Sequence, residues 1–361
     1  MPQVILGTRK GILKIKYDSK KINDLVEDFP GSAFSYAFQD HRNGNLWGCA
    51  DHGHWGAKLY LQKKGTKEWV EKTAPKYPDG EVIKEGKPAI LRYLWVMAAG
   101  PKSKPNHLYI GTEPGGLFES TDGGESFNLV KGLWNHPSRL THWMGGGRDN
   151  PGIHSIIIDE KDPLKISVGI SCAGFFRTLD GGKTWVPLNK GVTADFMPDK
   201  NPEVGQDAHF IAASPSNTKV IWQQNHCGIF RSIDDGHLWT KISQENGPAH
   251  FGFSITVDEK DEKTAYVIPL TADMNRVPVK NAMCVSKTVD GGKTWVEKRN
   301  GLPQKHCYDM VLRHAMDIQQ NNLIMGTTTG NLYASADAGE NWISLSSHLP
   351  PIYSIRFIQE M

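Results

Sequence analysis

Cysteine is scarce in this sequence of 361 residues, and it has no long hydrophobic run. The cysteines are scattered and odd in number, which fits neither a disulfide framework nor the paired spacing of zinc ligands. No stretch is long and apolar enough to predict a transmembrane helix, and no charged leader precedes an apolar run at the N-terminus. We therefore expect a cytoplasmic protein with no membrane partner. The cysteines are Cys49, Cys172, Cys227, Cys284 and Cys307.

A strong charge of either sign is also lacking. The net charge is +2, so the composition gives no indication of a nucleic-acid partner. Glycine, proline and tryptophan are plentiful (37, 21 and 11 residues), and 22% of the residues are charged, as in a soluble, turn-rich globular protein. At this length, one closed all-β domain spanning residues 1–361 is a reasonable expectation.

One pattern recurs along the chain, and residues 178–185 show it most clearly. A hydroxyl residue (Thr178) is followed by Asp180, Gly182 and a closing aromatic, Trp185, at fixed spacing. The short acidic side chain can accept hydrogen bonds from turn amides, and glycine can adopt positive φ, so the pattern predicts a tight hairpin turn. Further copies lie at residues 120–127, 232–239, 288–295 and 335–342.

The spacing of these copies predicts the architecture. Each is preceded by three short apolar runs separated by polar turns, which makes four short strands per repeat, with the recurring turn between the third and the fourth. The closing aromatics recur at intervals of 47 to 58 residues, which fits the blade of a β-propeller better than a helical repeat. They are Trp69, Phe127, Trp185, Trp239, Trp295 and Trp342.

The two ends of the chain complement each other. The N-terminal unit has strands at residues 4–8 and 11–16 but no first strand, whereas residues 350–358 form an apolar strand with nothing after it. Pairing the C-terminal strand with the N-terminal strands removes two free sheet edges. The sequence therefore predicts an all-β, seven-bladed β-propeller closed by its own ends, with six blades as the alternative.

The repeated turn resembles the Asp-box, or BNR repeat, of sialidase-like, sortilin-type and photosystem II assembly-factor propellers. Nearly the whole chain resembles bacterial and archaeal WD/YVTN/BNR-like proteins described as "glycosyl hydrolase" or "exo-alpha-sialidase". Residues 7–11, 111–118, 143–148, 224–231 and 251–253 carry this second resemblance. It implies a propeller of Asp-box repeats with a glycosidase-like activity.

Candidate functional residues gather on one predicted face. Loops between the second and third strands share a rim with the connections that lead to the next blade, and the recurring turns lie on the opposite face. Ring positions on this rim converge on the propeller axis, where a shared pocket is expected. The rim residues predicted to bind a ligand are Arg9, His52, Trp55, Arg148, Asp273 and Arg276.

Histidines on this rim suggest one hypothesis, a divalent transition-metal site. Neutral imidazoles from several blades suit zinc, iron, copper or nickel, and an open coordination position would supply hydrolytic or redox chemistry. No short motif such as His-Glu-x-x-His is present to fix the ligands. The predicted metal ligands are His54, His154, His209 and His226.

Glycoside chemistry is a second hypothesis, with Glu113 as acid or base and His209 and His226 as further catalytic residues. Glycoside hydrolysis normally requires two carboxyl groups that face each other across the scissile bond. The Arg-Ile-Pro motif and the arginine spacing of true sialidases are absent, which argues against literal sialidase activity. A metal-dependent hydrolase or lyase is the other enzymatic interpretation.

We therefore expect a propeller that binds, and cleaves, a small anionic or carbohydrate-like ligand. Arg9 and Arg148 would bind its negative charge, and the glycines 145–147 would let the backbone pass close to it. The alternative from another functional class is a non-catalytic propeller that serves as an interaction or assembly scaffold, because fold alone cannot decide between these roles.

Overall fold

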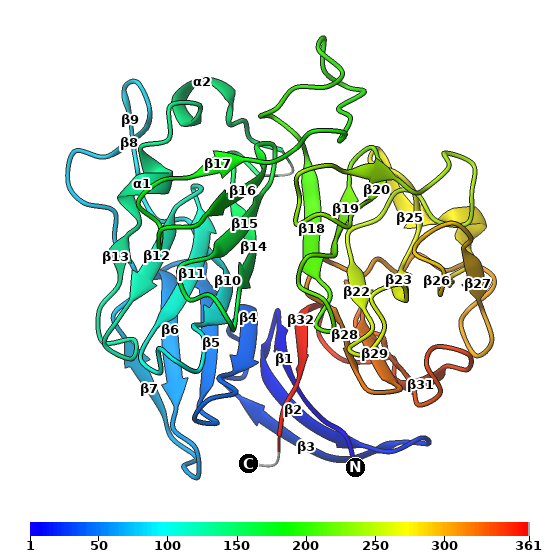
Figure 1. Ribbon diagram of the computed structural model, residues 1–361. Helices are drawn as coiled ribbons and strands as arrows, with labels where there is room; N and C mark the ends of the chain where they lie inside the picture. The colour runs from blue at the N-terminus through cyan, green and yellow to red at the C-terminus, as the bar shows by residue number, and fades with distance from the viewer. Residues whose placement is uncertain (147, 360–361) are drawn as a thin grey trace.

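Seven four-stranded antiparallel sheets make up most of the structure, a computed structural model that describes residues 1–146 and 148–359 (Figure 1). Gly147, one of the three consecutive glycines, lies outside the described residues. The first strands of successive sheets contact one another in a closed cycle, in the order β32, β4, β10, β14, β18, β22, β28 and back to β32. The predicted seven-bladed β-propeller is therefore confirmed, and the six-bladed alternative is wrong.

Each blade consists of four strands that follow one another from the axis outward. The blade that joins both chain ends contains β32 (Ile352–Phe357), β1 (Gln3–Thr8), β2 (Gly11–Tyr17) and β3 (Ile22–Asp28). The next three contain β4 (Phe34–Gln39), β5 (Leu46–His52), β6 (Gly56–Gln62) and β7 (Trp69–Lys72); β10 (Tyr93–Ala99), β11 (Leu108–Glu113), β12 (Leu117–Ser120) and β13 (Asn128–Leu129); and β14 (Ile153–Ile158), β15 (Ile166–Ile170), β16 (Gly174–Thr178) and β17 (Val186–Pro187). The last three contain β18 (Ala208–Ala213), β19 (Ile221–Asn225), β20 (Gly228–Ser232) and β21 (Thr240–Lys241); β22 (Ile255–Val257), β23 (Ala265–Val267), β26 (Val285–Thr288) and β27 (Val296–Lys298); and β28 (Met316–Gln319), β29 (Asn322–Gly326), β30 (Leu332–Ser335) and β31 (Ile343–Ser346).

The core lies between the blades. Middle strands such as β11 and β15 are buried along their whole length, because neighbouring sheets cover both of their faces, whereas the outermost β3 and β27 are largely exposed. Closing tryptophans link successive blades: the indole Nε1 of Trp239 donates to the carbonyl oxygen of Leu188 at 2.8 Å, and that of Trp295 donates to Ile242 at 3.0 Å. Each of these rings thus contributes both apolar packing and a partly buried hydrogen bond.

The recurring turn connects the third and fourth strands of its blade. In residues 178–185 the Oδ1 atom of Asp180 accepts hydrogen bonds from the amides of Lys183 and Thr184, each at 3.0 Å. The hydroxyl of Thr178 accepts the amide of Gly182 at 2.9 Å, and Gly182 has a φ of 97° that glycine adopts readily. The turn is thus held by its own side chains and lies at the rim away from the predicted pocket.

This turn yields a stability prediction for Asp180→Ala. Hydrogen bonds from Thr184 and Thr178 lower the pKa of Asp180, so its carboxylate stabilises the fold above the unfolded-state pKa of about 3.9. That contribution is lost as the pH falls through the lower folded-state pKa. We expect the variant to melt below the wild type at pH 7, with the difference shrinking toward pH 2 in thermal scans. Asp79→Ala, whose side chain is 96% exposed, is the control, and a pH-independent difference would contradict the prediction.

Closure of the ring follows the prediction made from the chain ends. β32 pairs antiparallel with β1, with Leu6 opposite Ile355 and Val4 opposite Phe357. The N- and C-termini consequently lie near each other at the bottom of Figure 1. The first blade therefore takes its innermost strand from one end of the chain and its other three strands from the other end.

Insertions enlarge the opposite rim. In Figure 1 the β8–β9 hairpin, α2 and the loop between β17 and β18 project together at the top. No described helix combines the length and apolar character that a membrane span requires. The inserted elements are β8 (Val82–Lys84), β9 (Lys87–Pro88), α1 (Lys131–Trp134), α2 (Arg139–His142), β24 (Leu270–Ala272), β25 (Asn275–Pro278) and the 3₁₀ helix η1 (Val279–Asn281).

Candidate functional site

A cavity of about 560 Å³ lies at the mouth of the ring on this enlarged rim. Its walls come from the starts of first strands and from loops between second and third strands of several blades, so residues far apart in sequence share one space. Five predicted site residues line it: Arg148, His209, His226, Asp273 and Arg276. They are joined by Tyr93, Trp95, Cys172, Phe196, Asp207, Phe253, Arg313 and Tyr353, among others.

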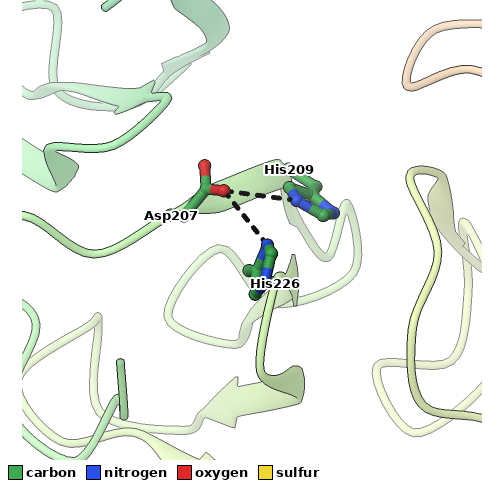
Figure 2. A group of neighbouring side chains, drawn as sticks. All are labelled: Asp207, His209 and His226. Atoms are coloured by element: carbon green, nitrogen blue, oxygen red, sulfur yellow. Dashed lines mark ion pairs between the residues drawn. The ribbon is translucent and has the colours of Figure 1, made fainter. Parts of the chain in front are cut away.

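Asp207, His209 and His226 form a cluster on one wall (Figure 2). The Oδ2 atom of Asp207 lies 3.5 Å from Nε2 of His209 and 3.4 Å from Nδ1 of His226. Nδ1 of His209 donates to the carbonyl oxygen of Gly252 at 2.7 Å, and the amide of Cys172 donates to Oδ1 of Asp207 at 3.3 Å. The backbone of Gly252 therefore orients the ring of His209, and the backbone of Cys172 orients the carboxylate of Asp207.

The charges of this cluster are coupled. Burial opposes ionisation of Asp207, but the neighbouring imidazoles of His209 and His226 hold the pKa of this carboxyl well below its ordinary value. The contact with the Asp207 carboxylate raises the pKa of His226, while burial acts in the opposite direction. The cavity wall thus carries an ionised carboxylate that is shared between two imidazoles.

The other two predicted metal ligands do not join this cluster. His154 is fully buried, with Nε2 donating to the carbonyl oxygen of Ala208 at 2.8 Å and Nδ1 bonded to the hydroxyl of Ser155 at 2.9 Å. Both ring nitrogens form hydrogen bonds, so His154 lies outside the cluster, and its assignment as a metal ligand stays a prediction. His54 is exposed on the β5–β6 hairpin, with its ring against Trp55.

The N-terminal rim residues also lie apart from the cavity wall. Nδ1 of His52 accepts the amide of Trp55 at 3.0 Å, so this histidine supports its own hairpin turn. The side chain of Trp55 is 69% exposed, and Arg9 is exposed beside the start of β32, where its amide donates to Pro351. None of these three is among the described residues that line the cavity. Their assignment to ligand binding stays a prediction.

Glu113 has a different environment from the one predicted for an acid or base. It is 3% exposed, and its carboxylate accepts hydrogen bonds from Nε of Arg148 and from Nδ2 of Asn150. The guanidinium of Arg148 lies 4.1 Å above the ring of Tyr93 and faces the cavity. Glu113 therefore positions Arg148 and is not itself among the lining residues.

Arg276 is held in a similar way on the opposite side. It lies on the β24–β25 insertion, forms an ion pair with Asp273 three residues earlier, and places its guanidinium 5.1 Å from the ring centre of Phe253. An arginine that is fixed by one carboxylate and one aromatic face keeps donors for a second anion. Arg148 and Arg276 thus present positive charge to the cavity from two different blades.

Arg313 is the cavity arginine that the sequence-based prediction missed. Its guanidinium lies 5.2 Å from the ring centres of both Trp95 and Phe253. Nε has no hydrogen-bond partner, and no ion pair with a carboxylate is found within the described part of the chain. Burial lowers the pKa of Arg313 to about 10, against the opposing attraction of Asp207. It is nevertheless a cation at neutral pH.

A positional signal for Arg313 was present in the sequence. It lies three residues before β28 (Met316–Gln319), at the entrance to a first strand, as Asp207 lies just before β18. None of the rim residues predicted from the sequence to bind a ligand belongs to this blade. An alignment of the blades on their first strands would have included Arg313 among the predicted rim residues.

Comparison with curated proteins finds remote similarity to xyloglucanases. The chain is 24% identical over 222 residues to a probable oligoxyloglucan-reducing end-specific xyloglucanase of Neosartorya fischeri, a match that covers 53% of this chain and 25% of that protein. It is 25% identical over 241 residues to xyloglucanase Xgh74A of Acetivibrio thermocellus, which covers 56% and 27% respectively. The matches thus span about a quarter of these relatives. No family model matches the chain.

Solved structures with a similar fold are also propellers. An ancestral GH74 enzyme matches with a TM-score of 0.58 and 15% identity, covering 94% of this chain and 39% of that one. YCF48 bound to D1 peptide matches with a TM-score of 0.53 and 14% identity, covering 88% and 90%. These similarities agree with the closed ring of this protein and place the chain among seven-bladed β-propeller proteins.

Proposed function

We propose that the protein binds a small anionic, carbohydrate-like ligand in the axial cavity and cleaves it. The observation that carries this proposal is Arg313, a cation in the cavity wall that forms no ion pair with any described carboxylate. Removing a charge from water is unfavourable unless it is paired, and a bound anion would supply the missing partner.

The remaining cavity chemistry supports the same class of ligand. Arg148 and Arg276 add positive charge, and the rings of Tyr93, Trp95 and Phe253 offer apolar faces on which a sugar ring can pack. A pocket with aromatic walls and a few convergent polar groups is typical of small-ligand sites. The remote similarity to xyloglucanases supports a carbohydrate in this position, and the arginines favour an acidic one.

Glycosidic cleavage would need a proton donor and an ionised group on the cavity wall. Among the described residues, Asp207 and Asp273 are the carboxylates that line the cavity. Glu113 is engaged by Arg148, so the role of the ionised group passes from Glu113 to these aspartates in this proposal.

A second candidate function is peptide binding or assembly without turnover. The match to YCF48, which was solved with a bound peptide, covers nearly the whole of both chains, whereas the GH74 enzyme is much longer than this protein. The exposed insertions around the cavity offer a surface for such a partner.

A ligand panel separates the two candidates. We expect acidic oligosaccharides built from uronic acids to raise the melting temperature and to bind in calorimetry, with an affinity that falls as salt is added. Ligand at 100 times its Kd should stabilise the fold by about 2.7 kcal/mol. Release of new reducing ends would show cleavage. Equal binding of neutral xyloglucan oligosaccharides would overturn the anionic part of the proposal, and binding of peptides alone would favour the scaffold.

A further inference from the structure

The spacing of donor atoms in the Asp207–His209–His226 cluster points to an ion. The three ligand atoms lie within 4.8 Å of one another, and the two imidazole nitrogens are 3.4 and 3.5 Å from the same carboxylate oxygen. These distances exceed the 2.7–3.2 Å range of good N–H···O hydrogen bonds. Two ligand atoms that bind one Zn²⁺ at 2.0–2.2 Å with tetrahedral geometry lie about 3.4 Å apart.

The tautomer of His209 strengthens this interpretation. A carbonyl oxygen can only accept, so Nδ1 of His209 must donate its proton to Gly252. In a neutral ring, Nε2 then directs a lone pair toward the ionised carboxylate of Asp207, which is repulsive unless a cation lies between them.

One blade supplies all three groups. Asp207 lies immediately before β18, and His209 is the second residue of that strand, at a β-bulge. His226 is in the adjoining β19–β20 hairpin, where its amide donates to the carbonyl oxygen of Asp207 at 3.0 Å. The contacts from Gly252 and Cys172 orient two of the ligands from behind, as outer contacts do in metal sites.

We propose that Asp207 Oδ2, His209 Nε2 and His226 Nδ1 bind one divalent transition-metal ion, with an open coordination position toward the cavity. Two imidazoles and one carboxylate suit Zn²⁺, Co²⁺ or Fe²⁺. The open position would take a water molecule or an oxygen of the ligand, and the ion would lower the pKa of that water or polarise that oxygen. Only this last step rests on the proposed function; binding of the metal does not.

The test uses the metal alone. Protein treated with a chelator is titrated with Co²⁺ and with Zn²⁺ and followed by calorimetry, by the visible absorption of Co²⁺ and by thermal unfolding. We expect one equivalent to bind and to raise the melting temperature. His226→Ala, at a partly exposed turn, and Asp207→Asn, which keeps the shape of the side chain, should each weaken binding at least about 100-fold.

His237→Ala is the matched control, because it removes an exposed imidazole at the opposite rim and should bind as the wild type does. Less than a tenth of an equivalent of metal after reconstitution would overturn the proposal, as would equal binding by the His226 and His237 variants. An NMR signal of a doubly protonated His209 in metal-treated protein would also overturn it in favour of a simple ion pair. Arg313 is not a ligand, so failure of sugar binding leaves this test unaffected.

Discussion

Replacing Arg313 by glutamine is expected to weaken binding of the anionic ligand by at least about 100-fold without destabilising the fold. Truncating one member of a buried charge pair costs about 2–5 kcal/mol of binding free energy, and about 2.7 kcal/mol corresponds to 100-fold. The fold should tolerate the change because Arg313 forms no ion pair among the described residues, and its guanidinium lies 5.2 Å from the ring centres of Trp95 and Phe253. Its charge is thus available to a ligand at little structural cost.

Arg177→Gln is the matched comparison. Arg177 is buried, and its guanidinium contacts Asp235 at 3.1 Å while its Nε donates to Ser167 at 2.9 Å. Breaking such a buried pair should cost about 3 kcal/mol of stability and leave ligand affinity unchanged. Calorimetric titration and thermal unfolding of both variants separate binding from stability. A strongly destabilised Arg313 variant with normal affinity would show that Arg313 serves the fold and not a ligand.

The architecture could be predicted from the sequence because a propeller repeats one short structural unit. The turn at residues 178–185 needs a hydroxyl, an aspartate and a glycine at fixed positions, and these interactions are all within eight residues. The missing first strand at one chain end and the solitary strand 350–358 at the other then left one way to close the ring. Local chemistry and strand counting were sufficient for this part.

For the site, the sequence predicted which residues lie on the same rim but not which of their side chains face the cavity. Strand order fixes which loops share a face, so His209, His226, Arg148 and Arg276 were expected near one another. It does not fix which way a side chain points at the entrance to a strand. His154 turns between the blades and donates to the carbonyl oxygen of Ala208 in the next one.

Side-chain contacts between different loops are harder to predict from a sequence. The contact that commits Glu113 to Arg148 spans two blades, and no spacing rule predicts it. Arg313 has no charged motif around it in the sequence, and it is distinctive because no described carboxylate forms an ion pair with it. Both facts depend on three-dimensional neighbours, and they move the predicted chemistry from Glu113 toward the Asp207 cluster.

Deleting residues 352–361 is expected to abolish cooperative folding. The deletion removes β32, in which Ile352 and Ile355 are fully buried between β1 and the neighbouring blade. Loss of one such side chain alone, as in Ile355→Ala, should cost about 2–5 kcal/mol, a large share of the 5–15 kcal/mol that stabilises a typical domain. The deletion also exposes the edge of β1 to pairing with other chains, so the truncated protein should aggregate.

A circular permutant tests whether the strand or the position of the chain end is what matters. Ile358 donates its amide to Gln3, so a short glycine–serine linker can join the two ends without disturbing β32. New ends placed in the exposed turn at Gly65, between β6 and β7, lie away from the cavity. We expect this permutant to melt within a few degrees of the wild type by circular dichroism and to elute as a single species in gel filtration.

If the truncated chain melted cooperatively at the same temperature, the six remaining blades would hold the ring without closure, and the first blade would be dispensable. If instead the permutant failed while the wild type folded, continuity at Gly65 would matter more than the pairing of β32 with β1.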